Sequence, residues 1–226
     1  MKFQHRSFRG DDCTIPSPEI YFEPQERLLI VATPWGNPKG ARKVVESLAD
    51  FYLSARTDRE ATSPFRRLEF LSPIANNLRI AGLIANERLY RESNKTEYTT
   101  GVEVFAAALF EKELAWLQVG QPHVFLKRQG QSLLPLSIQL NLASEIQAGQ
   151  KPLPPLPKNM LGIAPEPNLH IQSFTPQAED ALVLLSREWV PHEMFTAGTH
   201  DPTMETLSRV IGRFNETPFW LGYFSI

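Results

Sequence analysis

Two adjacent acidic residues near the start of the chain are the first candidates for metal chemistry. Asp11 and Asp12 follow the segment RSFRG and precede an apolar stretch that begins at Ile20. Neighbouring carboxylates just before a strand can present oxygen ligands to magnesium or manganese. Taken alone, the pair fits an exposed acidic turn better than a metal site.

The other side chains that commonly support catalysis are scattered along the sequence. The five histidines include no pair at the i, i+4 spacing of a helical zinc site, and Cys13 is the single cysteine. No Gly-x-Ser-x-Gly segment supports a Ser/His/Asp triad. Spacing therefore favours no enzyme class, although an acid–base pair of Asp12 with His123 or His192 stays open as a hypothesis.

The segment LLIVATPWGNPKGARKV, residues 28–44, raises the question of a phosphate-binding loop. Only three residues separate Gly36 from Gly40, and no hydroxyl residue follows Arg42, so the segment lacks the pattern of a P-loop. We predict a strand over 28–32, a turn at 33–37, and then a helix. The start of that helix could attract an anion, but most helix starts bind only water.

Composition limits the class of protein. With 226 residues, 42% of them hydrophobic, the chain can bury one sizeable core, so we predict a single domain over residues 1–226. A proline-rich surface loop is expected near residues 150–158.

The formal net charge of −2 gives no electrostatic reason to expect nucleic acid. No window approaches the roughly 20 apolar residues of a membrane span, and one cysteine fits a reducing compartment. We therefore expect a cytoplasmic protein that contacts neither membrane nor nucleic acid.

The hydrophobic pattern predicts an α+β chain. Apolar residues recur at helical spacing over 39–56, 73–91 and 203–213, and Ser72 before Pro73 is a plausible helix cap. Short apolar runs bounded by turn residues predict the strands, which are expected at 20–22, 28–32, three or four times in an antiparallel meander over 102–135, and at 170–174, 181–186 and 219–224. This order is not the strict alternation of a parallel α/β sheet, so sheets should stack with helices outside.

The order of these elements and several short motifs resemble the metal-dependent serine/threonine phosphatases of type 2C, the PPM family. The second helix, LRIAGLIANERLYRESN, is similar to a family helix that packs on the sheet. The segments LQVGQPH and KRQG are similar to a family turn and the strand end after it. The resemblance spans nearly the whole chain and implies a four-layer α-β-β-α sandwich of two antiparallel sheets with outer helices. The family uses two manganese or magnesium ions.

The departures from the family pattern fall on its chemistry. Thr33 stands where the family has the aspartate that bridges the two metals, and Arg187 where it has the aspartate of Ser-Asp-Gly. Gln121 replaces a turn aspartate, and Asn215 falls on the late Asp-Asn motif. A threonine hydroxyl carries no charge with which to bridge two dications. The resemblance thus implies a pseudophosphatase with no cofactor and no catalytic residues, in which Asp11 and Asp12 are remnants.

Such a protein is expected to act as a binding or regulatory module, with a signalling role as one form of it. We expect a protein partner, which could be phosphorylated, or a second copy of the chain. The candidate contacts for an anion or a partner are Arg6, Arg9, Trp35, Arg187 and Trp189. The simpler alternative for Arg187 is an ion pair with Glu188, Asp12 or Glu216. A divergent metal-dependent phosphatase or hydrolase with residual activity is the competing function.

Overall fold

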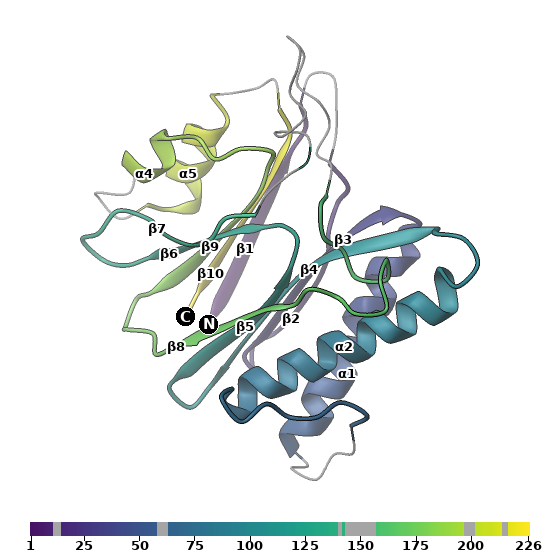
Figure 1. Ribbon diagram of the computed structural model, residues 1–226. Coiled ribbons are helices and arrows are strands. Elements are labelled where there is room, and N and C mark those ends of the chain that lie inside the picture. Colours follow the sequence, from purple (N-terminus) through teal and green to yellow (C-terminus); the bar gives the residue numbers. More distant parts are fainter. Residues whose placement is uncertain (11–14, 58–62, 140–141, 143–156, 197–201, 214–216) are drawn as a thin grey trace. The chain divides into compact units, whose positions relative to one another are not determined.

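The computed structural model describes residues 1–226 except 11–14, 58–62, 140–141, 143–156, 197–201 and 214–216 (Figure 1). The chain divides into two compact units. We call Pro18–Gly120 with Asn159–Thr175 the central unit, and Met1–Ser17, Gln121–Lys158 and Pro176–Ile226 the terminal unit. That both units form the single domain expected from the sequence stays a prediction.

The central unit is built on a five-stranded antiparallel sheet. Its strands lie in the order β2-β3-β4-β5-β8. Their bounds are β2 Glu19–Glu23, β3 Leu28–Gly36, β4 Thr100–Phe110, β5 Glu113–Val119 and β8 His170–Phe174. β3 and β4 are buried over almost their whole length. Their apolar runs are therefore typical of strands in the middle of a sheet.

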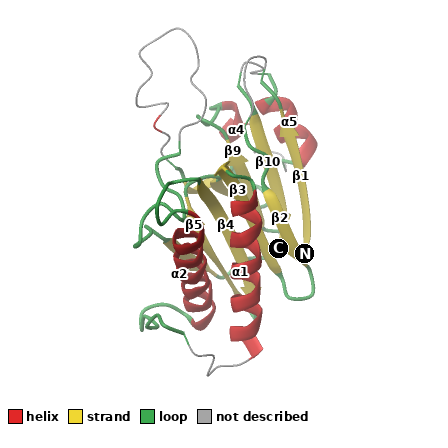
Figure 2. Cartoon of the chain, turned by 90° about the vertical axis from the view of Figure 1, so that its right-hand side faces the viewer, coloured by secondary structure: helices red, strands yellow, loops and turns green. Residues whose placement is uncertain are grey.

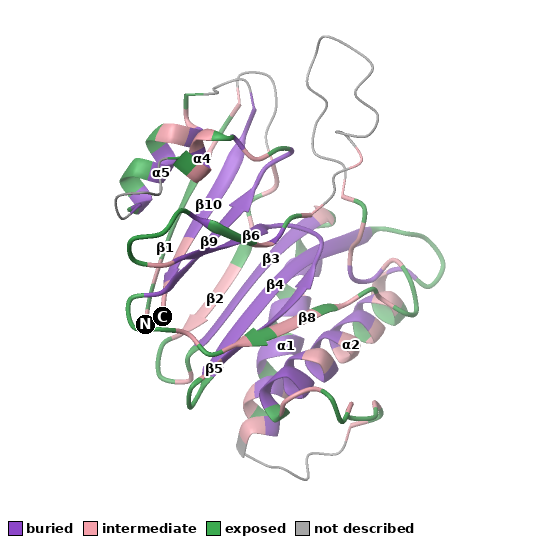
Figure 3. Ribbon diagram, turned by 60° about the vertical axis from the view of Figure 1, so that its left-hand side comes forward, coloured by how far each residue is buried: buried purple, intermediate pink, exposed green. Residues whose placement is uncertain are grey.

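Two long helices pack side by side against one face of this sheet (Figure 2). They are α1, Lys39–Thr57, and α2, Pro73–Ser93, and their inward faces form one apolar core with the sheet. The Ser72 hydroxyl accepts a hydrogen bond from the Ala75 backbone N–H at 3.3 Å, which confirms the predicted cap. Buried and exposed residues alternate along both helices, as Figure 3 shows.

The terminal unit carries a second five-stranded antiparallel sheet, in the order β1-β10-β9-β6-β7. Its strands are β1 Lys2–Phe8, β6 His123–Lys127, β7 Leu134–Ser137, β9 Ala181–Ser186 and β10 Phe219–Ser225. The short helices α4, Glu193–Thr196, and α5, Met204–Ile211, pack on one face around Leu207 and Ile211. The Thr203 side chain caps α5 and forms a capping box with Thr206.

Two sequence predictions about this architecture are wrong. The expected turn at 33–37 does not interrupt β3, which continues to Gly36 opposite Thr100 of β4. The meander over 102–135 is not one sheet: β4 and β5 belong to the central unit, and β6 and β7 to the terminal unit. After Gly120 the chain leaves the sheet of the central unit and enters the sheet of the terminal unit. The φ of Gly120 is +69°, which suits glycine.

Strand β1 and helix α4 have no counterpart among the predicted elements. The other predicted helices and strands are present, and both sheets are antiparallel with helices packed on them. The proline-rich loop lies almost wholly outside the described residues. No helix in the described part of the chain is long and apolar enough to cross a membrane.

Candidate functional site

Thr33, which the sequence resemblance matches to the family's bridging aspartate, lies in β3 directly opposite Glu103 of β4. Glu103 is 4% exposed, and its Oε2 accepts a hydrogen bond of 2.9 Å from the indole Nε1 of Trp35. Trp35 is half-buried, and its polar edge is therefore committed to this carboxylate. The sequence analysis overlooked Glu103, although it is the only acidic residue inside the apolar run of β4.

Gln121, in the terminal unit, is bonded at both ends of its amide to the backbone of Arg187. Its Nε2 donates to the Arg187 carbonyl at 2.6 Å, and its Oε1 accepts from the Arg187 N–H at 2.8 Å. The start of β6 is thereby joined to the segment that follows β9. Because both amide groups are satisfied internally, Gln121 contributes to the fold as a structural link.

The side chain of Arg187 is fully buried inside the terminal unit. Its Nε donates to the Thr217 hydroxyl at 2.9 Å and its Nη1 to the Ile211 carbonyl at 3.1 Å. The guanidinium also lies over the ring of Trp189, 4.6 Å from the ring centroid. Burial lowers the pKa of Arg187 to about 10, although the nearby Glu188 opposes this change. The group therefore stays a cation at neutral pH, held by hydroxyl, carbonyl and aromatic partners.

The alternatives for Arg187 can be compared with these contacts. Glu188 is an electrostatic neighbour, but the hydrogen bonds above go to Thr217 and Ile211. Asp12 and Glu216 lie outside the described residues. An anion from solution would have to reach a guanidinium with no exposed surface. Anion binding at Arg187 therefore stays a prediction that requires local opening.

His123 has both ring nitrogens engaged. Nδ1 accepts a hydrogen bond from the Gln139 backbone N–H at 3.0 Å, so Nε2 carries the proton and donates to the Arg187 carbonyl at 3.0 Å. The residue is 1% exposed, and burial lowers its pKa to about 4. A neutral ring with two backbone partners is not placed to exchange protons with a substrate. The hypothesis that pairs His123 with Asp12 therefore loses its support, and His192 lies on an exposed segment before α4.

The remaining predicted contacts have separate positions. Arg6 of β1 donates to the Glu205 carboxylate at 2.8 Å and to the Ser208 hydroxyl at 3.2 Å, and thus connects the strand to α5. Arg9 is exposed beyond the end of β1. Trp189 is 38% exposed beside Arg187. Asp11, Asp12 and Asn215 lie outside the described residues.

Taken one by one, the residues that the sequence resemblance matches to the family's metal ligands are not suited to bind a divalent cation. Thr33 offers a neutral hydroxyl, the Gln121 amide is bonded to backbone at both ends, and Arg187 is a cation. Manganese and magnesium prefer carboxylate and water oxygens. Within the described residues, no group of three or more His, Cys, Asp or Glu side chains could hold a metal. We therefore derive no metal-dependent step from these residues.

The sequence matches no family model and no curated protein. Solved structures, in contrast, match the whole chain. The PPM phosphatase MsPP of Mycobacterium smegmatis, solved in complex with cacodylate, has a TM-score of 0.70 and 16% identity, covering 100% of this chain and 98% of that one. PppA, a regulatory component of the T6SS in Pseudomonas aeruginosa, has a TM-score of 0.65 and 14% identity, covering 100% and 97%.

A serine/threonine phosphatase of S. agalactiae has a TM-score of 0.66 and 17% identity, covering 98% of both chains. At these identities the likeness concerns the fold alone. The chain has the α+β fold of the PPM phosphatases, with two five-stranded antiparallel sheets and their helices. The resemblance inferred from short motifs is thereby confirmed at the level of the fold.

Proposed function

We propose that this chain is a pseudophosphatase: a protein with the phosphatase fold, no bound metal and no turnover, which acts as a binding or regulatory module. The observation that carries the proposal is the bond between Gln121 and Arg187. At two positions matched to family aspartates, the side chain of one residue holds the backbone of the other. Both residues are thus part of the internal hydrogen bonding of the terminal unit.

The electrostatics support the same proposal. Family catalysis depends on metals that lower the pKa of a bound water and neutralise phosphate oxygens. A buried guanidinium such as that of Arg187 repels a dication, and the hydroxyl of Thr33 carries no negative charge with which to attract one. The indole N–H of Trp35 is also bonded to the carboxylate of Glu103, the residue directly opposite Thr33 in the sheet. The chain is therefore proposed to need no cofactor.

A turnover assay tests catalytic inactivity. The full chain is incubated with p-nitrophenyl phosphate and with a phosphothreonine peptide over a range of manganese concentrations, beside an active PPM phosphatase. We expect no turnover above background for the wild type or for Thr33→Asp. Thr33→Asn is the matched control for the size of the new side chain. Turnover by the wild type that disappears with a chelator would instead support the competing function, a divergent hydrolase.

The binding role is proposed to use a protein partner, phosphorylated or a second copy of this chain, at the surface around Trp189. Trp189 is a partly exposed aromatic residue, of the kind that anchors interfaces. The solution mass of the wild type and of Trp189→Ala tests self-association. Because Trp189 stacks on Arg187, Trp189→Phe, which keeps a ring there, controls for loss of folding. If all three proteins have the same solution mass and capture the same protein partners, the surface around Trp189 is excluded as the binding surface.

A further inference from the structure

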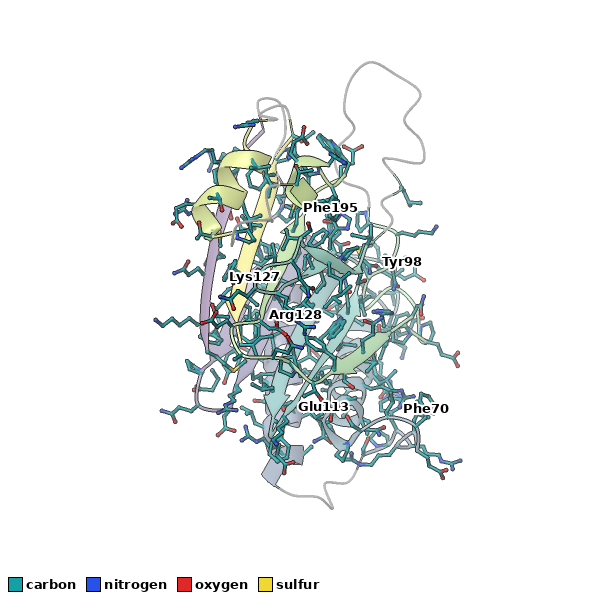
Figure 4. All side chains as sticks on the ribbon, turned by 90° about the vertical axis from the view of Figure 1, so that its left-hand side faces the viewer. Phe70, Tyr98, Glu113, Lys127, Arg128 and Phe195 are labelled. Carbon is teal, nitrogen blue, oxygen red and sulfur yellow. The ribbon has the colours of Figure 1, made fainter. Side chains whose placement is uncertain are left out.

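A cavity of about 610 Å³ lies in the central unit, at the end of the helix pair where α1 finishes and α2 begins. Figure 2 shows these two helix ends beside each other. The turn between β4 and β5 closes another side of the cavity, through Phe110 and Glu113; Glu113 is labelled in Figure 4. All of the lining residues belong to the central unit. The volume is within the range of about 300–1,000 Å³ that is typical of small-molecule sites.

The base of the cavity is apolar. The ring of Tyr52 and the side chains of Ala55 and Ile74 line it, and each of these residues is at most 5% exposed. Phe110, at 42% exposed, brings an aromatic ring to the mouth. Arg56 lies over this ring at 5.4 Å and is fixed there by an ion pair with Glu26. The cavity therefore has an apolar interior and a charged edge.

The hydroxyl of Tyr52 is a buried hydrogen-bond donor at the cavity. Tyr52 is 2% exposed, and no described residue shares a hydrogen bond with its hydroxyl. The hydroxyl is not among the fully enclosed, unpartnered polar atoms of the described core, so part of its surface is accessible, and Tyr52 lines the cavity. Burial raises the pKa of Tyr52 to about 12, which keeps the hydroxyl protonated and able to donate. A buried donor that faces a cavity without a protein partner is suited to a ligand acceptor.

The charges at the edge give the ligand a direction. Arg67 lines the cavity and donates to the Asn77 side-chain oxygen at 2.7 Å, which holds the guanidinium at the start of α2. The positive end of the α2 dipole lies at the same place, beside Ile74. On the side formed by the β4–β5 turn, Glu111 and Glu113 line the cavity together with Lys112, which lies between them in the sequence. An anionic group is thus favoured on the α2 side and disfavoured next to the two glutamates.

We propose that this cavity binds a small organic acid, in which one carboxylate is carried on a compact aromatic or aliphatic body. The body would fill the apolar base, and the carboxylate would accept hydrogen bonds from the Tyr52 hydroxyl and from Arg67. This inference does not rest on catalytic inactivity, because the cavity lies entirely in the central unit and uses none of the residues matched to the metal site.

Ligand-observed NMR and calorimetry on the full chain test the proposal. The probes are 3-phenylpropanoate and octanoate, with 3-phenylpropanol as the neutral counterpart of the first. We expect saturable binding of the acids with dissociation constants of about 1 mM or tighter, and binding of the alcohol that is weaker by about tenfold or more. Tyr52→Phe removes only the hydroxyl, and Arg67→Gln removes the cation together with its hydrogen bond to Asn77, so each should weaken the acids by about tenfold.

Two controls separate this site from non-specific binding. Tyr98→Phe removes a hydroxyl from a residue that is 66% exposed, and Arg42→Gln removes an exposed cation that is paired with Glu46. Neither residue lines the cavity, so neither variant should change the affinity. Because the Tyr52 hydroxyl has no described partner, Tyr52→Phe should unfold at the same urea concentration as the wild type. The proposal is overturned if neither acid binds at about 10 mM, if the alcohol binds equally well, or if Tyr52→Phe binds like the wild type.

Discussion

We expect acid to destabilise this protein through His123, because the folded chain holds its imidazole neutral. Burial lowers the pKa of His123 to about 4, compared with an ordinary value of 6.5. In a window between these values the unfolded chain binds a proton that the folded chain does not bind. The stabilisation linked to His123 is therefore complete above about pH 6.5 and is lost as the pH falls toward about pH 4.

The structure gives the size of this effect. The difference between 6.5 and about 4, at about 1.4 kcal/mol per pH unit, corresponds to about 3 kcal/mol at most. Between about pH 7 and about pH 5 the linkage relation leaves a loss of about 2 kcal/mol in the free energy of unfolding. The side chain is almost fully buried, so solvent screening reduces this figure little.

Urea unfolding of wild type and His123→Asn across this pH range measures the effect. Asparagine can still accept the Gln139 N–H but does not titrate, so the pH dependence should become flatter by about 2 kcal/mol. His170→Asn is the comparison variant. Partial burial also lowers the pKa of His170, but its side chain keeps much of its contact with solvent, so its effect on stability should be smaller. If His123→Asn retains the pH dependence of the wild type, the neutral, doubly bonded imidazole is refuted.

Three further substitutions test the structural account. Asp180 is bonded by both oxygens to Arg128 at 3.0 and 2.8 Å; burial alone would raise its pKa, but these bonds bring it below the ordinary value. Asp180→Asn should therefore cost about 3 kcal/mol in urea unfolding at neutral pH, and less in acid. Asn94→Ala removes the hydrogen-bond partner of the Thr100 and Gly162 carbonyls and of the Thr100 N–H, and should cost about 3 kcal/mol. Thr203→Ala removes the α5 cap and should cost about 1 kcal/mol, whereas Thr203→Ser should restore most of it.

The helices and most strands could be predicted because their apolar periodicity is local. The extension of β3 could not, since Pro34 and Gly36 signal a turn. The register explains why a strand tolerates Pro34: the pairing of β2 with β3 stops at Ala32, so beyond that residue β4 is the only described strand beside β3. A proline that lacks an N–H can occupy such an edge. Likewise, local patterns identify β4 to β7 but not the sheet that each joins.

The candidate site was predicted by residue type and not by arrangement. That Thr33, Gln121 and Arg187 replace family aspartates stays a prediction from the sequence resemblance; the sequence alone shows only their residue types. The bond between Gln121 and Arg187 spans 66 residues, so no local signal predicts it. The cavity around Tyr52 could not be predicted either, because it combines two helix ends with the β4–β5 turn. In the sequence, Tyr52 fits the apolar face of the helix predicted over 39–56.

The most direct test of the central claim is a calorimetric titration of the full chain with manganese chloride, with an active PPM phosphatase titrated under the same conditions. The sequence resemblance matches Thr33, Gln121 and Arg187 to metal ligands, and a hydroxyl, an amide and a buried guanidinium offer no negative charge to a dication. We predict no saturable heat with a dissociation constant below about 1 mM. Tight binding of two manganese ions per chain would contradict the proposal.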